Sequence, residues 1–331
     1  MKSAHRYQRL TIAVLLVFSI AALGLSLLIG SVSIVWNDLI SFFRLGTVSM
    51  TTMVVLELRL PRAFSAFVVG SSLAVAGVMM QVLLRNPLAD PYVLGVSGGS
   101  AAFALIVMLL GFPFSAVPIA ATMGAGFSIV LLILLARTSG DWGSSRLLLT
   151  GIVLASGWGA LIGFFLSLGE ANQIQGMLFW LMGDLRPEWP GFIRVLVLLA
   201  VLIAGFIVAR DLDLLLEGDL RARSLGLNTS ALRLIILLAA SLLTAASVTL
   251  AGPVGFIGLV VPHMMRLIIG SRHRLLIPVS ALAGGTLLVI AEMIARTVIA
   301  PQQLPVGVIT SFIGVPVFLY LLRRRGLSIP S

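Results

Sequence analysis

The sequence has no cysteine and only one lysine, Lys2, and charged residues make up only 10% of its 331 positions. The absence of cysteine excludes a disulfide framework and a thiolate metal site. The absence of a Gly-x-x-x-x-Gly-Lys-Ser/Thr sequence excludes a phosphate-binding P-loop of the usual kind. The three histidines, His5, His263 and His273, have no carboxylate at metal-ligand spacing. We therefore expect no catalytic site, no bound metal and no nucleotide site in this chain.

Hydrophobic residues, in contrast, make up 59% of the chain. A soluble domain is closer to about 45–50% apolar and about 25% charged, so both deviations indicate a chain whose solvent is largely lipid. A spanning helix needs about 20 mostly apolar residues, and about ten spans with short loops would occupy nearly the whole sequence. A β-barrel would alternate over segments of about ten residues, which runs such as Leu131–Leu135 do not. The prediction is an all-α polytopic transmembrane helical bundle of about ten spans, with residues 1–331 as a single membrane domain.

Ten apolar segments separated by polar stretches mark these spans. Because backbone groups in lipid must be hydrogen-bonded within their own segment, each segment is expected to be a helix. The first segment follows basic residues, as a signal peptide would, but it is longer than a usual signal core and no clear small-x-small cleavage site ends it. We therefore treat it as a retained span. The segments are 11–30, 61–83, 93–111, 115–136, 147–168, 191–209, 231–251, 256–270, 275–299 and 305–322.

The basic residues orient the predicted bundle. With ten spans and the N-terminus in the cytoplasm, 16 of the 22 basic residues fall on the cytoplasmic side, the run Arg323–Arg325 among them. Cytoplasmic loops carry such an excess of Lys and Arg, so the net charge of +10 is better explained by topology than by nucleic-acid binding. Both termini are therefore expected in the cytoplasm. The six basic residues on the opposite side are Arg44, Arg59, Arg62, Arg186, Arg194 and Arg296.

Three connecting segments carry more pattern than an ordinary loop. The outer segment 169–190 has an apolar middle, which favours a short interfacial helix. The cytoplasmic segment 210–230 has helical apolar spacing on both sides of Gly218, which predicts two short helices with a break between them. The segment 251–262 is rich in Gly and Pro and predicts a broken helix, which survives at membrane depth only against protein or a watery cavity.

Ionisable residues inside the predicted spans are few, and Glu292 and Arg266 are the main candidates for a functional role. Glu292 lies four residues before Arg296, so the two side chains can pair on one helix face. A structural or interfacial pair is favoured over a proton relay. Gly95, Gly98 and Gly99 are interpreted as positions of close helix packing.

Five motifs occur in one order along most of the chain: Leu58–Arg62, Arg85–Pro91 with Leu94–Gly99, Ser144–Gly151, Gly252–His263, and Leu304–Val308 with Gly314–Phe318. In this combination the sequence resembles the FecCD-type family of permeases, which serve importers of iron siderophores, haem and vitamin B12. The resemblance implies a homodimer of ten-span subunits in the bacterial inner membrane, with two cytoplasmic ATPase subunits that bind ATP and Mg²⁺ and with a periplasmic binding protein. Transport would proceed by alternating access between the two permease subunits.

The leading expectation is therefore a permease subunit, not an enzyme, that moves a ferric siderophore. Haem and vitamin B12 remain open within the family. An alternative of a different class is a proton-coupled secondary transporter that depends on Glu292. A passive channel is disfavoured because no charged ring or filter-like motif is present.

The resemblance also implies roles for particular residues. Outer-face arginines of the family dock carboxylates of the binding protein, for which the arginine fork is well suited, and the alternative is an arginine that only anchors a helix end. The segment 210–230 matches the coupling helices that contact the ATPase, against the alternative of a solvated linker. The serines before the fifth span match the cytoplasmic gate, and a helix N-cap is an alternative role that is compatible with gating. The neighbouring turn is grouped with the gate; its two prolines favour a rigid structural turn, and its position also suits contact with the ATPase. The candidates are Arg59, Arg62 and Arg296 for docking; Glu217, Gly218, Asp219, Arg221, Arg223, Leu225 and Gly226 for coupling; and Ser144, Ser145, Asn86 and Pro87 for the gate.

Overall fold

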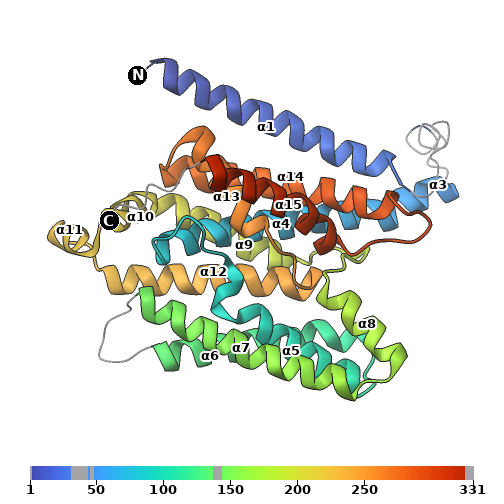
Figure 1. Cartoon of the computed structure of the whole chain (residues 1–331). Helices are drawn as coiled ribbons and strands as arrows, with labels where there is room; N and C mark the ends of the chain where they lie inside the picture. The colour runs from blue at the N-terminus through green and yellow to red at the C-terminus, as the bar shows by residue number, and fades with distance from the viewer. Residues whose placement is uncertain (1, 31–43, 45–47, 137–143, 325–331) are drawn as a thin grey trace.

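The computed structural model describes residues 2–30, 44, 48–136 and 144–324, and within these ranges every regular element is a helix. Figure 1 shows the elements in chain order. The longer helices are α1 (Lys2–Leu28), α4 (Leu60–Leu83), α5 (Val96–Leu109), α6 (Val117–Ala136), α7 (Ser144–Leu168), α8 (Ala171–Leu181), α9 (Phe192–Ile207), α12 (Thr229–Ala251), α13 (Ile257–Ile269), α14 (His273–Thr297) and α15 (Val306–Arg324). The short elements are α3 (Met50–Met53), the π-helical turn η1 (Val54–Arg59), the 3₁₀ turns η2 (Pro91–Leu94) and η3 (Phe114–Ala116), α10 (Ala209–Leu216) and α11 (Asp219–Ser224).

Each predicted apolar segment lies on a helix, so the all-helical membrane fold is confirmed. Six helical stretches of the described chain are long and apolar enough to cross a membrane, and α9 with α10 makes a seventh that is bent by 65°. The helices α5, α13 and α15 are apolar but shorter. The prediction of about ten spans therefore holds for the number of apolar helices and is approximate as a number of full-length crossings.

The two ends of the molecule carry the elements expected on opposite sides of the membrane. The start of α1 lies at the same end as α10 and α11, and α3 and α8 lie at the other end (Figure 1). We call these the predicted cytoplasmic end and the predicted outer end. Arg137 and Arg325, two of the 16 basic residues counted on the cytoplasmic side, lie outside the described residues.

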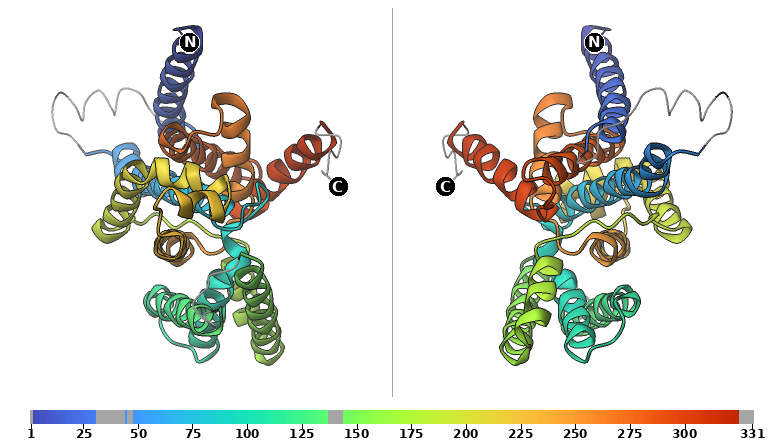
Figure 2. Two further views of the ribbon diagram at one scale, coloured as in Figure 1. Left: turned by 90° about the vertical axis from the view of Figure 1, so that its left-hand side faces the viewer. Right: turned by 90° about the vertical axis from the view of Figure 1, so that its right-hand side faces the viewer.

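Helix α4 is the centre of the bundle, with α14, α12 and α13 packed around it (Figure 2). Nearly all of its residues are buried, because small side chains let neighbouring backbones approach closely. A Cβ atom on Gly70 would lie 2.3 Å from the carbonyl oxygen of Gly284 in α14. The helices α5, α6 and α7 form a second group beside α12, and there a Cβ on Gly99 would lie 2.6 Å from the carbonyl oxygen of Gly124. This confirms the packing role predicted for Gly99.

Two of the shorter apolar helices, α13 and α5, begin where the backbone is broken. The chain leaves α12 at Gly252 (φ +65°), runs without helix to Phe256 (φ +68°), and resumes as α13 at Ile257. This confirms the predicted break in 251–262. Helix α5 likewise follows the turn η2 and Gly95 (φ +77°). The two breaks meet beside α4, because Gly258 lies directly against Pro91.

The other two connecting segments also fold as predicted. The apolar middle of 169–190 forms α8. The cytoplasmic segment forms α10 and α11, with Gly218 between them at φ +119°, a conformation that side chains with a Cβ rarely adopt.

Candidate functional site

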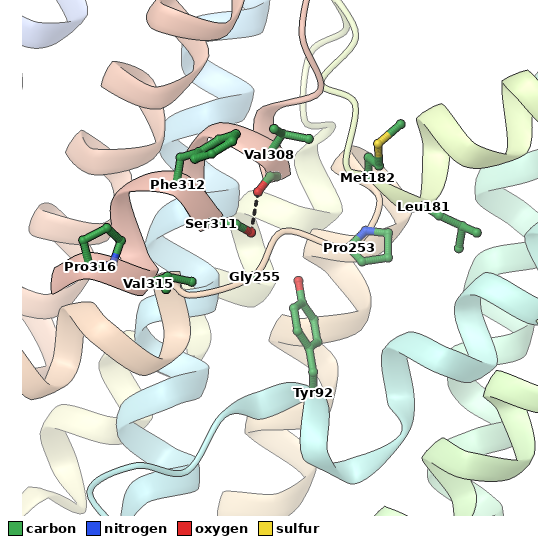
Figure 3. Close-up of a pocket in the computed structure, with 11 residues that line it drawn as sticks. Tyr92, Leu181, Met182, Pro253, Gly255, Val308, Ser311, Phe312, Val315 and Pro316 are labelled. Carbon is green, nitrogen blue, oxygen red and sulfur yellow. Dashed lines mark hydrogen bonds between the residues drawn. The ribbon is translucent and has the colours of Figure 1, made fainter. Parts of the chain in front are cut away.

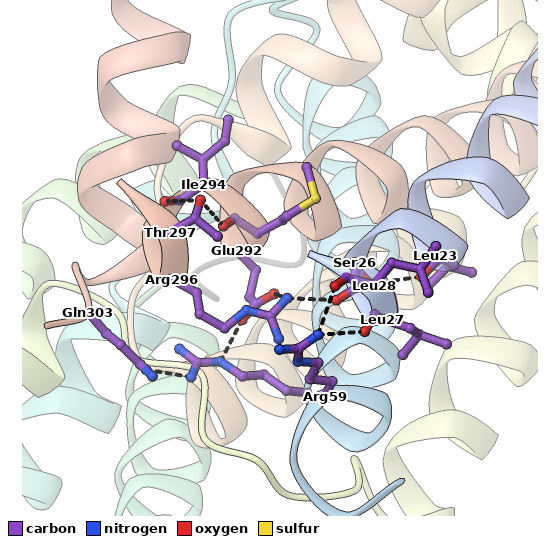
Figure 4. A network of polar contacts seen from close by, with 12 residues as sticks. Leu23, Ser26, Leu27, Leu28, Arg59, Glu292, Ile294, Arg296, Thr297 and Gln303 are labelled. Carbon is purple, nitrogen blue, oxygen red and sulfur yellow. Dashed lines mark hydrogen bonds and ion pairs between the residues drawn. The ribbon is translucent and has the colours of Figure 1, made fainter. Parts of the chain in front are cut away.

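The three arginines predicted for docking line one cavity at the predicted outer end, and two of them pair with Glu292. Figure 4 shows Arg59 and Arg296 beside Glu292. Arg59 ends η1 and Arg62 lies in the first turn of α4, so their spacing of three residues puts them on one face. The Arg62 Nε atom lies 2.7 Å from Glu292 Oε1, and the Arg296 Nη2 atom lies 3.5 Å from Glu292 Oε2. The predicted pairing of Glu292 with Arg296 on one helix face is confirmed, and Arg62 joins it from another helix.

The same arginines bind the end of α1. Arg59 Nη1 donates to the carbonyl oxygens of Leu27 and Leu28, both at 2.9 Å, and Arg296 Nη2 donates to the carbonyl of Ser26 at 2.8 Å. The last carbonyls of a helix lack partners within it and carry partial negative charge. The two guanidinium groups therefore cap α1 and hold it against the bundle.

The cluster is buried but lies beside a cavity. The exposed fractions are 3% for Arg59, 7% for Arg62, 5% for Arg296 and 0% for Glu292. The cavity has a volume of about 260 Å³ and is lined by the three arginines with Val54, Leu58, Pro187 and Gln303. Gln303 accepts a hydrogen bond from Arg62 Nη1 at 2.5 Å. The structure thus gathers the predicted docking residues at one site, and their docking role stays a prediction.

The predicted coupling segment is held together by Asp219, the first residue of α11. Its two carboxylate oxygens each lie 3.0 Å from Arg233 Nη2 of α12, and one oxygen also pairs with Arg85. Arg85 in turn donates from Nε to the Leu215 carbonyl at the end of α10. The break at Gly218 is therefore fixed by contacts to α12 and to Arg85 in the turn after α4, as expected of a defined structural unit.

The remaining coupling candidates lie on the surface of this segment. Glu217 and Arg221 form an exposed ion pair at 2.8 Å, and Arg223 Nε donates to Thr229 Oγ1 at 3.0 Å. Gly226 (φ +83°) follows the end of α11. The exposed fraction of Leu225 is 61%, and that of Leu220, which sequence reasoning missed, is 88%. Both leucine side chains are thus accessible for contact with a partner, and the coupling role of this segment stays a prediction.

Helix α10 also contacts the start of α14. The Asp213 carboxylate accepts a hydrogen bond from the backbone N–H of His273 at 3.1 Å, and its Oδ1 lies 2.5 Å from His273 Nδ1. A carboxylate at a helix N-terminus is favourable because it binds a free backbone donor there. This contact connects the predicted coupling segment with the helix that carries Glu292 at its other end.

The four gate candidates lie in two places. Helix α7 begins at Ser144, and Ser145 next to it is exposed. The Asn86 side chain accepts a hydrogen bond from the Leu88 backbone N–H at 2.9 Å, and Pro87 beside it is exposed. The hydrogen bond of the Asn86 side chain fits a structural turn, and gating by the four residues stays a prediction.

A larger cavity of about 650 Å³ lies where the two backbone breaks meet α8 and α15 (Figure 3). The Tyr92 hydroxyl donates to the carbonyl oxygen of Val254 at 3.0 Å and accepts from the N–H of the same residue at 2.8 Å. The phenol thereby supplies both partners that the broken helix does not. Sequence reasoning identified the break but missed Tyr92. The lining residues are Tyr92, Leu181, Met182, Pro253, Gly255, Gly307, Val308, Ser311, Phe312, Val315 and Pro316.

The chain combines helices that are broken beside a cavity with a folded segment, 210–230, at one end and buried arginines at the other. This combination is typical of a polytopic membrane transport protein. The model of the FecCD transport family matches residues 15–324. The chain belongs to this family and is an ABC importer permease. Of the two classes left open by the sequence, this membership favours the ATP-driven importer over the proton-coupled carrier.

Several characterised proteins are similar over most of this chain. It is 39% identical over 320 residues to the Fe(3+) dicitrate transport system permease protein FecD of Escherichia coli, covering 95% of this chain and 99% of that protein. It is 42% identical over 282 residues to the vitamin B12 import system permease protein BtuC of Vibrio cholerae, covering 84% and 85%. It is 40% identical over 279 residues to the hemin transport system permease protein HmuU of Yersinia pestis, covering 82% and 83%. A solved chain of a metal-chelate type ABC transporter in an inward-facing conformation has 25% identity and a TM-score of 0.83, covering 96% and 99%.

Proposed function

We propose that this chain forms a homodimer in the bacterial inner membrane, with both termini in the cytoplasm, and imports a ferric siderophore by alternating access. A periplasmic binding protein delivers the substrate to the outer end, where Arg59, Arg62 and Arg296 bind its carboxylates. Two ATPase subunits, which hold ATP and Mg²⁺, dock on the segment 210–230. The chain itself contributes no catalytic group and no cofactor.

The observation that carries this proposal is the cavity of about 650 Å³ beside the two backbone breaks. Its volume lies within the range of about 300–1,000 Å³ that is typical of sites for small molecules. Its lining is mostly apolar, and Phe312 and Val315 of α15 are exposed at 74% and 41%. A second copy facing these residues would enlarge and close the cavity, which suits a bulky chelate.

Haem and cobalamin remain the second candidates, because relatives named for ferric citrate, vitamin B12 and hemin share 39–42% identity with this chain. Among the described residues that line the cavity, none carries a charged side chain that would select among these substrates.

The test is uptake into proteoliposomes that contain this permease and the ATPase encoded with it, with the purified binding protein outside. A ferric siderophore, haemin and cobalamin are offered separately, each with ATP or with a non-hydrolysable analogue inside. We expect uptake of the ferric siderophore that requires both ATP and the binding protein. Uptake of haemin or cobalamin instead would replace the substrate while keeping the mechanism. Uptake that follows a proton gradient without the ATPase would refute the importer proposal.

A further inference from the structure

The arginines proposed to receive the binding protein already hold a carboxylate of their own chain. Glu292 uses one oxygen for Arg62, at 2.7 Å, and the other for Arg296, at 3.5 Å. An aspartate or glutamate of a docking partner would offer the same two oxygens to the same two guanidinium groups. The internal and the external carboxylate are therefore chemical equivalents at this site.

The position of Glu292 keeps its carboxylate permanently beside the two arginines. Its side chain is 0% exposed, and it lies four residues before Arg296 on α14, so helix geometry alone keeps this pair together. Arg62 reaches it from α4, whose backbone is in close contact with α14 at Gly70 and Gly284. Neither helix can move away from the other without breaking that contact.

The cavity beside the cluster leaves room for a second carboxylate. About 260 Å³ is several times the roughly 30 Å³ that one water molecule occupies in the liquid. Leu58 and Pro187, which also line this cavity, are exposed, so the space borders the predicted outer surface. A carboxylate that enters here meets Arg62 while the guanidinium group is still bound to Glu292 and Gln303.

We propose that Glu292 is an internal counter-ion that competes with the binding protein's carboxylate for Arg62 and Arg296, and so sets the affinity of docking. The inference rests on the proposed docking role of the arginines. Glu292 acts through those arginines and is a positioning residue. Its pairing offsets part of their positive charge when no partner is present, and it weakens the docked complex enough for release.

The experiment measures the dissociation constant between the permease in nanodiscs and the purified binding protein encoded with it, at fixed ionic strength. Glu292→Gln keeps the shape of the side chain and removes its charge. Since the ion pairs with Glu292 no longer have to be exchanged, we expect the dissociation constant to fall about tenfold. Glu170→Gln is the matched control, because it removes the same charge from an exposed side chain at the other end of the outer segment 169–190, which does not line the cavity. It is expected to change the constant by less than about twofold, as a long-range effect screened by salt.

Further variants separate this inference from the docking proposal. Arg62→Ala and Arg296→Ala should each weaken binding if the arginines dock the partner. If they weaken binding but Glu292→Gln leaves it unchanged or weaker, the competition proposal is overturned and docking stands. If neither arginine variant changes the affinity, the docking proposal itself fails.

Loss of Glu292 could also prevent folding, because it leaves buried guanidinium groups without their counter-ion. Melting curves of each variant in nanodiscs report this directly. In that case Glu292→Asp carries the test, since it retains the charge but shortens the side chain by one methylene group and pulls the carboxylate back from Arg62. We then expect tighter docking than in the wild type, by a smaller factor than for Glu292→Gln, and unchanged or weaker docking would overturn the proposal.

Discussion

The replacement Tyr92→Phe removes a single oxygen atom and tests how the broken helix is held. That oxygen donates to the Val254 carbonyl at 3.0 Å and accepts from the Val254 N–H at 2.8 Å. The exposed fraction of Val254 is 1%, so its backbone groups have little access to solvent. Phenylalanine keeps the ring and its packing, and the change is therefore confined to the two hydrogen bonds.

The expected loss follows from the groups left behind. A buried donor or acceptor without its partner costs about 1–3 kcal/mol, and we expect Tyr92→Phe to lower the free energy of unfolding by an amount in that range. The adjacent cavity can admit water to the freed groups, which favours the lower half of the range. The assay is reversible unfolding in mixed micelles, with helical circular dichroism as the signal.

Tyr320→Phe is the matched control. Tyr320 is 60% exposed on α15, and its hydroxyl forms no hydrogen bond with the residues that the structure describes. Its replacement should therefore change the free energy of unfolding by less than about 0.5 kcal/mol. Equal free energies of unfolding for the two variants would refute the view that the Tyr92 hydroxyl stabilises the broken segment between α12 and α13. Faster hydrogen exchange at the Val254 amide in Tyr92→Phe alone would place the effect at the expected residue.

Three further predictions concern other parts of the molecule. Gly77→Ala should destabilise the protein by about 1–3 kcal/mol, because a Cβ atom there would lie 1.9 Å from a backbone oxygen of α13. Gly126→Ala is the control and should stabilise the protein slightly, because a Cβ atom there would have no atom within 4 Å. Unfolding titrations compare the two variants. Leu220→Ser should reduce copurification of the ATPase several-fold while the melting temperature stays the same, whereas Ser224→Ala on the same short helix should leave copurification intact; an equal yield of ATPase from both would argue against α11 as a docking element. Asp219→Asn should cost about 1 kcal/mol, since its ion pairs are partly exposed, and should lower ATP-dependent uptake more than binding of the ATPase, which pull-down and uptake assays measure separately.

The helices and their breaks could be predicted from the sequence because both are local properties. Apolar runs of about 20 residues report lipid burial, and Gly218 reports a break because only glycine accepts φ +119° without strain. The start of α5 was predicted less well than that of α13, which was placed to within one residue at each end. The predicted helical segment 93–111 includes residues 93–95, which lie in the turn η2 and at Gly95, because hydrophobicity continues where the helical backbone does not.

The cluster of arginines around Glu292 shows which contacts could not be predicted from the sequence. The pairing of Glu292 with Arg296 follows from a spacing of four residues on one helix. The pairing of Glu292 with Arg62 depends on how α4 and α14 pack, and their closest approach is created by glycines whose contacts no periodicity reveals. The capping of α1 by Arg59 is of the same kind.

The contacts between Tyr92 and Val254, and the exposure of Leu220, were missed for two different reasons. The first joins residues 162 positions apart, through two backbone breaks that must be placed before they can be paired. The second required knowing which face of a six-residue helix points away from the protein, and a helix that short has too few apolar positions to show its face.

Helix α14 has a mechanical consequence. It is 25 residues long, which corresponds to about 37 Å along its axis. Its first residue is held by Asp213 of α10, and its last turns carry Glu292 and Arg296. The helix continues through Pro278 and is attached near both ends, so we expect it to transmit motion as a lever does. A tilt of α14 imposed at one membrane face would displace its opposite end, and the close contact with α4 at Gly70 and Gly284 would be the pivot.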